Sequence, residues 1–290
     1  MSTALRPPRR LPFGLSPLAA IAAAALLIFV IMAILAPWLA PFDPARQTLL
    51  ARLKPPGFTS ASGAVYWLGT DEVGRDLLSR VIYGARISLL VAVLSVAVSG
   101  TIGTILGMIA GTYRGWVEIL IMRLVDIVLS IPAILLAIVT VAVLGPGLLN
   151  LVLVLGLTRW PRYTRVAYGQ TLQVANLTYV TAARISGVRG PRLLLRHMLP
   201  NILAPMIVVA TLEFGLMVLF EAGLSFLGLG IQPPTPSWGS ILAVGRNYVA
   251  QAWWIATLPG FCLFALVLSI NLLGDFLRDR FDPRSQTRTP

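Results

Sequence analysis

The chain has 290 residues, of which 57% are hydrophobic and 12% are charged, and its formal net charge is +12. A soluble domain carries roughly 25% charged residues. This deficit, together with several apolar runs of about 20 residues, excludes an ordinary soluble protein and predicts an all-α polytopic membrane protein. Most arginines flank apolar runs, which indicates the positive-inside rule rather than nucleic-acid binding.

The first predicted span begins at Pro17 and ends near Leu39. Three arginines precede it, so residues 1–16 are expected to form a cytoplasmic N-terminal tail. The apolar run is longer than the core of a signal peptide and shows no clear small-residue cleavage site, so we expect an uncleaved span. Residues 17–85 are therefore predicted to hold this span and a polar extracytoplasmic segment.

The extracytoplasmic segment ends in a stretch of acids, arginines and glycines. Thr70 or Asp71 is a candidate helix cap, because acids follow in what would be the first helical turn. Leu77 and Val81 belong to an apolar stripe with three- and four-residue spacing. The residues after Asp76 are thus predicted to form an amphipathic helix on the outer membrane surface.

The second span is predicted over residues 87–113, which carry no charge. Gly103, Gly107 and Gly111 fall four residues apart, on one helix face. Small residues at this spacing let two helix backbones approach closely within a membrane. We therefore assign these glycines to helix packing.

The third and fourth spans are predicted over residues 117–145 and 148–166, with a Gly-Pro-Gly break between them. Pro132 is a candidate kink in the third span. In the fourth span, long cationic side chains are expected to extend toward the cytoplasmic interface. These side chains are Arg159, Arg162 and Arg165.

Residues 167–199 form a predicted cytoplasmic loop that is rich in arginine. Within it, the helical spacing of residues 170–183 predicts one helix, and Gly187 allows a sharp bend after it. Gly190 and Pro191 are suited to start a second short helix.

The fifth span is predicted over residues 200–229 and contains Glu213 near mid-membrane and Glu221 about two turns further out. Ionised carboxylates are costly in lipid, so both should face the bundle interior, a cavity or a partner. They either line a transport pathway or gate, or join helices through a hydrogen bond or ion pair, and both interpretations remain open. For Asp126 in the third span, beside Arg123, we favour a structural role.

The last part of the chain is predicted to contain an outer loop at residues 232–239, a short interfacial helix at 242–254 and a sixth span at 256–277. Six spans place both termini in the cytoplasm. With this topology, 16 basic residues lie on the cytoplasmic side and seven on the outer side. The inverted topology would place the arginine-rich loop outside, so it is rejected.

Motifs for catalysis or cofactor binding are missing from the sequence. The one lysine, Lys54, is not part of a Gly-Lys-Ser/Thr phosphate-binding loop, so the chain is predicted not to be an ATPase or another enzyme. His197 and Cys262 are the only residues of their types and lie on different elements. We expect no metal site and no cofactor bound by this chain.

Two motifs resemble those of bacterial ABC importer permeases. The cytoplasmic loop is similar to that family's coupling loop, whose pattern is Glu-Ala-Ala, three residues, Gly, and later Leu-Pro. The matching residues are Ala182, Ala183, Gly187, Leu199 and Pro200, and Thr181 stands where the family usually has Glu. A second stretch resembles the signature of the C-type permeases in the dipeptide/oligopeptide/nickel branch. Its residues are Gly69, Thr70, Asp71, Gly74, Arg75 and Asp76. Residues 221–234 and 271–283 also resemble that branch.

The resemblance implies a type I importer permease fold, in which residues 86–290 form a core of five spans. It implies a bacterial cytoplasmic (inner) membrane location and four kinds of partner: a second, homologous permease, two ATPase subunits that bind ATP-Mg, an extracytoplasmic binding protein and the lipid bilayer. Arg184 and its neighbours in the loop would contact the ATPase. The cargo would be dipeptides, oligopeptides or nickel chelates, moved by alternating access. The alternative is an ion-gradient-driven secondary transporter that uses Glu213 or Glu221.

Overall fold

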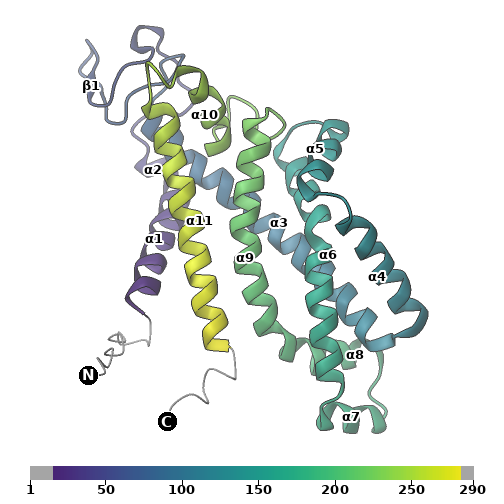
Figure 1. The fold of residues 1–290 in the computed structure, drawn as a ribbon. Coiled ribbons are helices and arrows are strands. Elements are labelled where there is room, and N and C mark those ends of the chain that lie inside the picture. Colours follow the sequence, from purple (N-terminus) through teal and green to yellow (C-terminus); the bar gives the residue numbers. More distant parts are fainter. Residues whose placement is uncertain (1–15, 282–290) are drawn as a thin grey trace, which may run out of the picture.

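The computed structural model describes residues 16–281, and nearly all of its regular structure is helical (Figure 1). The predicted N-terminal tail, apart from Ser16, lies outside the described residues. The longer helices are α1 (Pro17–Ile34), α3 (Leu77–Tyr113), α4 (Gly115–Leu129), α5 (Ala133–Leu144), α6 (Leu148–Ala175), α9 (Leu199–Phe226) and α11 (Trp254–Phe281). The short ones are α2 (Ala36–Leu39), α7 (Thr178–Ile185), α8 (Gly190–Leu193) and α10 (Trp238–Gly245).

Smaller elements complete the loops. Two 3₁₀ turns, Leu49–Ala51 and Arg246–Tyr248, and a π-helical turn, Leu194–Met198, join the helices. A two-stranded antiparallel hairpin pairs β1 (Phe58–Thr59) with β2 (Val65–Tyr66). The hairpin and α10 lie at one end of the bundle and α7 and α8 at the other, so we call these the α10 end and the α7 end (Figure 1).

Four described helices, α1, α3, α9 and α11, are long and apolar enough to cross a membrane, and α9 does so together with α8 and the π turn. The bent pair α4–α5 counts as a fifth candidate when it is taken as one broken span. The structure thus confirms a helical membrane protein with four to five candidate spans. Helix α6 has the necessary length, but three arginines interrupt its apolar sequence.

Helix α3 runs obliquely behind α9 and α6 in Figure 1 and packs closely on α6. A Cβ atom added at Gly107 would lie 2.6 Å from the Cβ atom of Ala167, and one added at Gly111 would lie 2.8 Å from that of Thr171. Real side chains do not tolerate such distances. The packing role predicted for these glycines is therefore confirmed.

The predicted surface helix after Asp76 is wrong, because α3 continues without a break from Leu77 into the second span. Its first apolar residues do not rest on lipid. Leu77 and Val81 are buried in a cluster with Ile241 of α10 and Ile255 of α11. The predicted apolar stripe is present, but it packs against helices from the far end of the chain rather than on lipid.

The third span is broken rather than kinked. Helices α4 and α5 meet at an angle of 87°, and Pro132 stands directly before α5. Proline lacks the amide hydrogen that would continue the helix. The Ser130 hydroxyl donates to the Ile127 carbonyl at 2.7 Å and satisfies one backbone oxygen at the break. We call residues 128–133 the elbow.

Two other boundaries differ from the predictions. Helix α6 continues to Ala175 and α7 begins at Thr178, so the single helix predicted over residues 170–183 is wrong. Residues 167–175 of the predicted loop instead extend α6. The predicted interfacial helix at 242–254 is wrong, because α10 begins at Trp238. Ser237 and Ser240 form a reciprocal capping box there, which fixes the earlier start.

Candidate functional site

The loop that contains α7 has a defined backbone shape, because a hydrogen-bonded bend follows the C-terminal end of this helix. Gly187 follows α7 with a φ of +88°, in the left-handed region that glycine adopts without steric cost. Its amide donates to the Arg184 carbonyl, and the Val188 amide donates to that of Ala183, each at 3.0 Å. These two bonds form a Schellman cap. The bend predicted at Gly187 is present and hydrogen-bonded.

Helix α7 has one buried and one exposed face. Val180 is fully buried among residues that include Met198 and Ile202, in a core cluster shared with α6 and α9. Thr181 and Ala182 are exposed, and the Ile185 side chain is 83% exposed. The exposed face of α7 thus carries small and partly apolar side chains, and the buried Val180 anchors the helix to α6 and α9.

The two halves of the predicted loop motif meet at the base of α9. The Tyr179 hydroxyl and the Asn201 amide both donate to the carbonyl of His197, at 3.1 and 2.7 Å. Leu199 packs on the same core cluster as Val180, whereas Pro200 is exposed. The structure therefore brings the Thr181–Gly187 and Leu199–Pro200 motifs into one unit.

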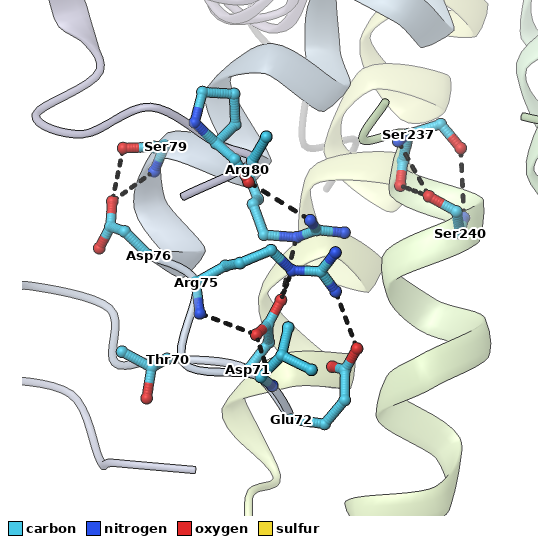
Figure 2. A network of polar contacts seen from close by, with 12 residues as sticks. Thr70, Asp71, Glu72, Arg75, Asp76, Ser79, Arg80, Ser237 and Ser240 are labelled. Atoms are coloured by element: carbon cyan, nitrogen blue, oxygen red, sulfur yellow. Dashed lines mark hydrogen bonds and ion pairs between the residues drawn. The ribbon is translucent and has the colours of Figure 1, made fainter. Parts of the chain in front are cut away.

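The signature stretch at residues 69–76 forms a buried network at the α10 end (Figure 2). Asp71 Oδ1 accepts from the backbone amides of Val73 and Arg75, and its Oδ2 pairs with Arg75 Nε at 2.6 Å. Arg80 Nε lies 3.3 Å from the same Oδ2 atom, and Arg75 Nη2 donates to Glu72 at 2.8 Å. Gly74 and Gly69 have positive φ angles, which let the chain turn around this cluster.

Asp76, not Thr70 or Asp71, caps the helix that follows. Its Oδ2 atom accepts from the Ser79 amide at 2.7 Å and from the Ser79 hydroxyl at 2.6 Å. Burial raises the pKa of Asp76 above its ordinary value, although the two bonds from Ser79 act in the opposite direction. The Thr70 hydroxyl instead donates to the Ala51 carbonyl and accepts from the backbone amide of Lys54.

Helices from the far end of the chain are hydrogen-bonded to the signature and to the start of α3. The indole of Trp254 in α11 donates to the Thr70 carbonyl at 3.2 Å, and that of Trp238 in α10 donates to the Val81 carbonyl at 2.9 Å. Helix α3 spans about 55 Å at 1.5 Å per residue, so the signature lies far from α7. Its contacts indicate that the signature holds the helices together at the α10 end.

Glu213, in the middle of α9, forms the main charged contact inside the bundle. The Arg159 guanidinium of α6 donates to both carboxylate oxygens, at 2.9 and 3.0 Å, and Arg162 Nε lies 3.3 Å from Oε1. Glu213 is 1% exposed. The prediction that Arg159 extends to the cytoplasmic interface is wrong, since a carboxylate holds it within the bundle.

Glu221 is fully buried, and hydroxyl groups rather than a cation meet its oxygens. Ser88 of α3 donates to Oε2 at 2.7 Å, and Ser225 donates to Oε1 at 2.8 Å. The Ser88 bond joins α9 to α3, whereas the Ser225 bond lies within α9. The contact is a hydrogen bond between helices, one of the two structural alternatives weighed for this residue.

Asp126 pairs with Arg165 of α6 at 2.6 Å rather than with its neighbour Arg123. Both side chains are about half exposed. Sequence reasoning did not identify Arg159 and Arg162 as functional candidates. The available signal was their three-residue spacing inside an apolar helix, together with an unpaired glutamate in another span.

Comparisons with known proteins show the family of the chain. Residues 103–287 match the family model described as binding-protein-dependent transport system inner membrane component, and residues 13–56 match the N-terminal TM domain of oligopeptide transport permease C. The chain is 48% identical over 259 residues to the di/tripeptide transport system permease protein of Pseudomonas aeruginosa, covering 89% of this chain and 86% of that one. It is 43% identical over 270 residues to the probable D,D-dipeptide transport system permease protein of Escherichia coli, covering 93% and 89%.

A solved structure shares the fold. It is the crystal structure of an amino acid ABC transporter with histidines, with a TM-score of 0.53 at 13% identity, covering 70% of this chain and 95% of that chain. At this identity the likeness concerns the fold alone.

Proposed function

The chain belongs to the binding-protein-dependent transport system inner membrane components, and from that premise we propose that it is the C-type permease subunit of an ATP-driven importer of dipeptides or oligopeptides. It is a multi-pass protein of the bacterial inner membrane, with the permease fold of ABC importers, and not itself an enzyme. The names of the relatives support peptide cargo. They give no support to an ion-gradient-driven transporter.

The proposed topology has six spans, with α6 as the additional one. The arginines of α6 oppose it, but carboxylates of α9 and α4 balance two of them. Helix α6 is about 42 Å long, enough to cross a hydrocarbon core of roughly 30 Å. Six spans place both termini and α7 on the cytoplasmic side, where the basic loop belongs.

The observation that carries the proposal is the exposed face of α7 on its buried base. Thr181, Ala182 and Ile185 present small and apolar groups outward, and Arg184 can meet acidic partner groups. We propose that this face docks on an ATPase subunit and transmits its motion to α6 and α9. The remaining proposed partners are a second ATPase subunit, a second permease and an extracytoplasmic binding protein, with ATP-Mg bound by the ATPases.

The test is a deletion of this chain, with measurement of dipeptide uptake and of the proteins that co-purify with the restored chain. We expect uptake to disappear on deletion, to return with the chain, and to require ATP. ATPase subunits should co-purify. Unchanged peptide uptake in the deletion strain, or uptake that survives ATP depletion but fails with an uncoupler, would refute the proposal.

A further inference from the structure

A cavity of about 430 Å³ lies between the elbow and α6. The elbow contributes mainly apolar side chains, whereas α6 contributes Thr158 and three arginines. The arginines are Arg159, Arg162 and Arg165. Sites for small molecules commonly have volumes of about 300–1,000 Å³ and combine apolar walls with a few polar groups. The cavity is therefore large enough for a small ligand.

The charges around the cavity do not balance. Arg165 pairs with Asp126, and Arg159 occupies both oxygens of Glu213. Arg162 approaches only an oxygen that Arg159 already uses, and its side chain is 57% exposed. Three guanidinium groups thus face two carboxylates, and the excess positive charge belongs to Arg162.

The depth of this charge excludes a lipid headgroup as its natural partner. Glu213 lies at the middle of α9, about 20 Å along the helix from either end. Arg162 Nε lies 3.3 Å from the Glu213 carboxylate, so its charge is at the same depth. Lipid phosphates lie outside a hydrocarbon core that is roughly 30 Å thick. An excess cation near its centre requires water or an anion within the protein.

The elbow supports the same conclusion. A helix that breaks at membrane depth leaves backbone groups unpaired, and this is tolerated where the break is buried in protein or lines a water-filled cavity. Here the break lines the cavity that holds the arginines. The broken span and the excess cation therefore line one cavity.

We infer that this cavity is an anion subsite on the transport path, in which Arg162 binds the carboxylate of a passing peptide. The inference rests on the proposed function, because it takes peptide as the cargo. A guanidinium group suits this task, since its parallel N–H donors match the two oxygens of a carboxylate. The neighbouring Arg159 is already paired with Glu213, so it does not compete for the ligand.

The test uses thiol labelling of the complete importer in lipid vesicles. Cys262→Ala removes the single native thiol of this chain, and Ala133→Cys places one in the cavity wall. A thiol reagent bearing a sulfonate should react there faster than one bearing a trimethylammonium group, by about tenfold. Rates are normalised to Leu50→Cys, a 93% exposed position in the outer segment. Dialanine should protect the cavity thiol, and dialanine amide should not.

Arg162→Gln should abolish both the anion preference and the protection, whereas Arg123→Gln should leave both intact. Arg123 is an exposed arginine of α4 that does not line the cavity, so it is a matched control. Equal rates for the two reagents, or protection by the amide that is as strong as protection by the peptide, would overturn the inference. A thiol that stays unlabelled in every nucleotide state would also overturn it, because another subunit would then fill the cavity. If peptide is not the cargo, the anion preference persists without protection by dialanine, and only the proposed function and the peptide ligand fail.

Discussion

Replacing Gly187 with alanine is expected to weaken the attachment of the ATPase subunits without disturbing the helix bundle. The added methyl group meets nothing within 4 Å, so the effect does not arise from a clash. It arises from the φ angle of +88°, because a left-handed residue with a Cβ atom costs about 1–2 kcal/mol. That strain opposes the Schellman cap and lowers the population of the bent loop about five- to thirtyfold.

The assay is a titration of purified ATPase subunits onto the permease in lipid nanodiscs, followed by peptide uptake in cells. Gly169→Ala is the matched control, since Gly169 is helical and also has open space around it. Alanine there should stabilise α6 by about 0.5–1 kcal/mol and leave docking unchanged. Gly187→Val should be more harmful than Gly187→Ala, because a β-branched side chain restricts the backbone further. Normal docking and uptake in both Gly187 variants would refute the reasoning.

Three further predictions concern stability, each measured by thermal unfolding of the purified chain in detergent. Gly107→Ala should destabilise the chain by about 1–3 kcal/mol through overpacking against α6. Gly100→Ala is the control and should be nearly neutral, because its added Cβ atom would lie 3.4 Å from the nearest neighbouring atom. Equal effects of the two substitutions would contradict the close α3–α6 contact. Glu213→Gln should cost about 3–5 kcal/mol, because it leaves the largely buried Arg159 guanidinium without its partner carboxylate. The double variant with Arg159→Gln should recover part of the loss, and additive effects would show that the pair is not coupled. Burial raises the pKa of Asp76, so its stabilising contribution is present below its ordinary pKa of 3.8 and is lost as pH rises through the raised value. Asp76→Asn keeps a helix cap and should flatten that acidic pH dependence, and an unchanged profile would exclude Asp76 as its source.

The long apolar helices could be predicted from the sequence because their signal is local. Composition alone locates α1, α3, α9 and α11, and the glycine spacing of α3 correctly indicated a close helix contact. The break near Pro132 was expected as a kink, but its angle of 87° depends on the elements that surround it. Local pattern gives the position of such a break and not its geometry.

Contacts between distant parts of the chain could not be predicted in the same way. Arg159 and Glu213 are 54 residues apart, and neither segment shows which charge the other supplies. Alone, an arginine in a span is expected to extend toward water, and only the partner carboxylate keeps it inside. At the α7 loop, the bend at Gly187 followed from residue type, whereas the bond from Tyr179 to the His197 carbonyl required the folded chain.

The contacts of α6 differ in strength, and this difference indicates where the bundle opens. The Arg159–Glu213 pair joins α6 to α9 at a buried position, where breaking it costs about 3–5 kcal/mol. The Arg165–Asp126 pair joins α6 to α4 with both side chains about half exposed, and such a pair contributes about 0–1 kcal/mol. Under the proposed coupling, motion received at α7 is expected to carry α6 and α9 together, since both also share the core cluster around Val180. Tyr168 of α6 also hydrogen-bonds to Glu118 of α4, but neither of these contacts involves the elbow. We therefore expect the elbow to separate from α6 and to widen the cavity that Arg162 lines.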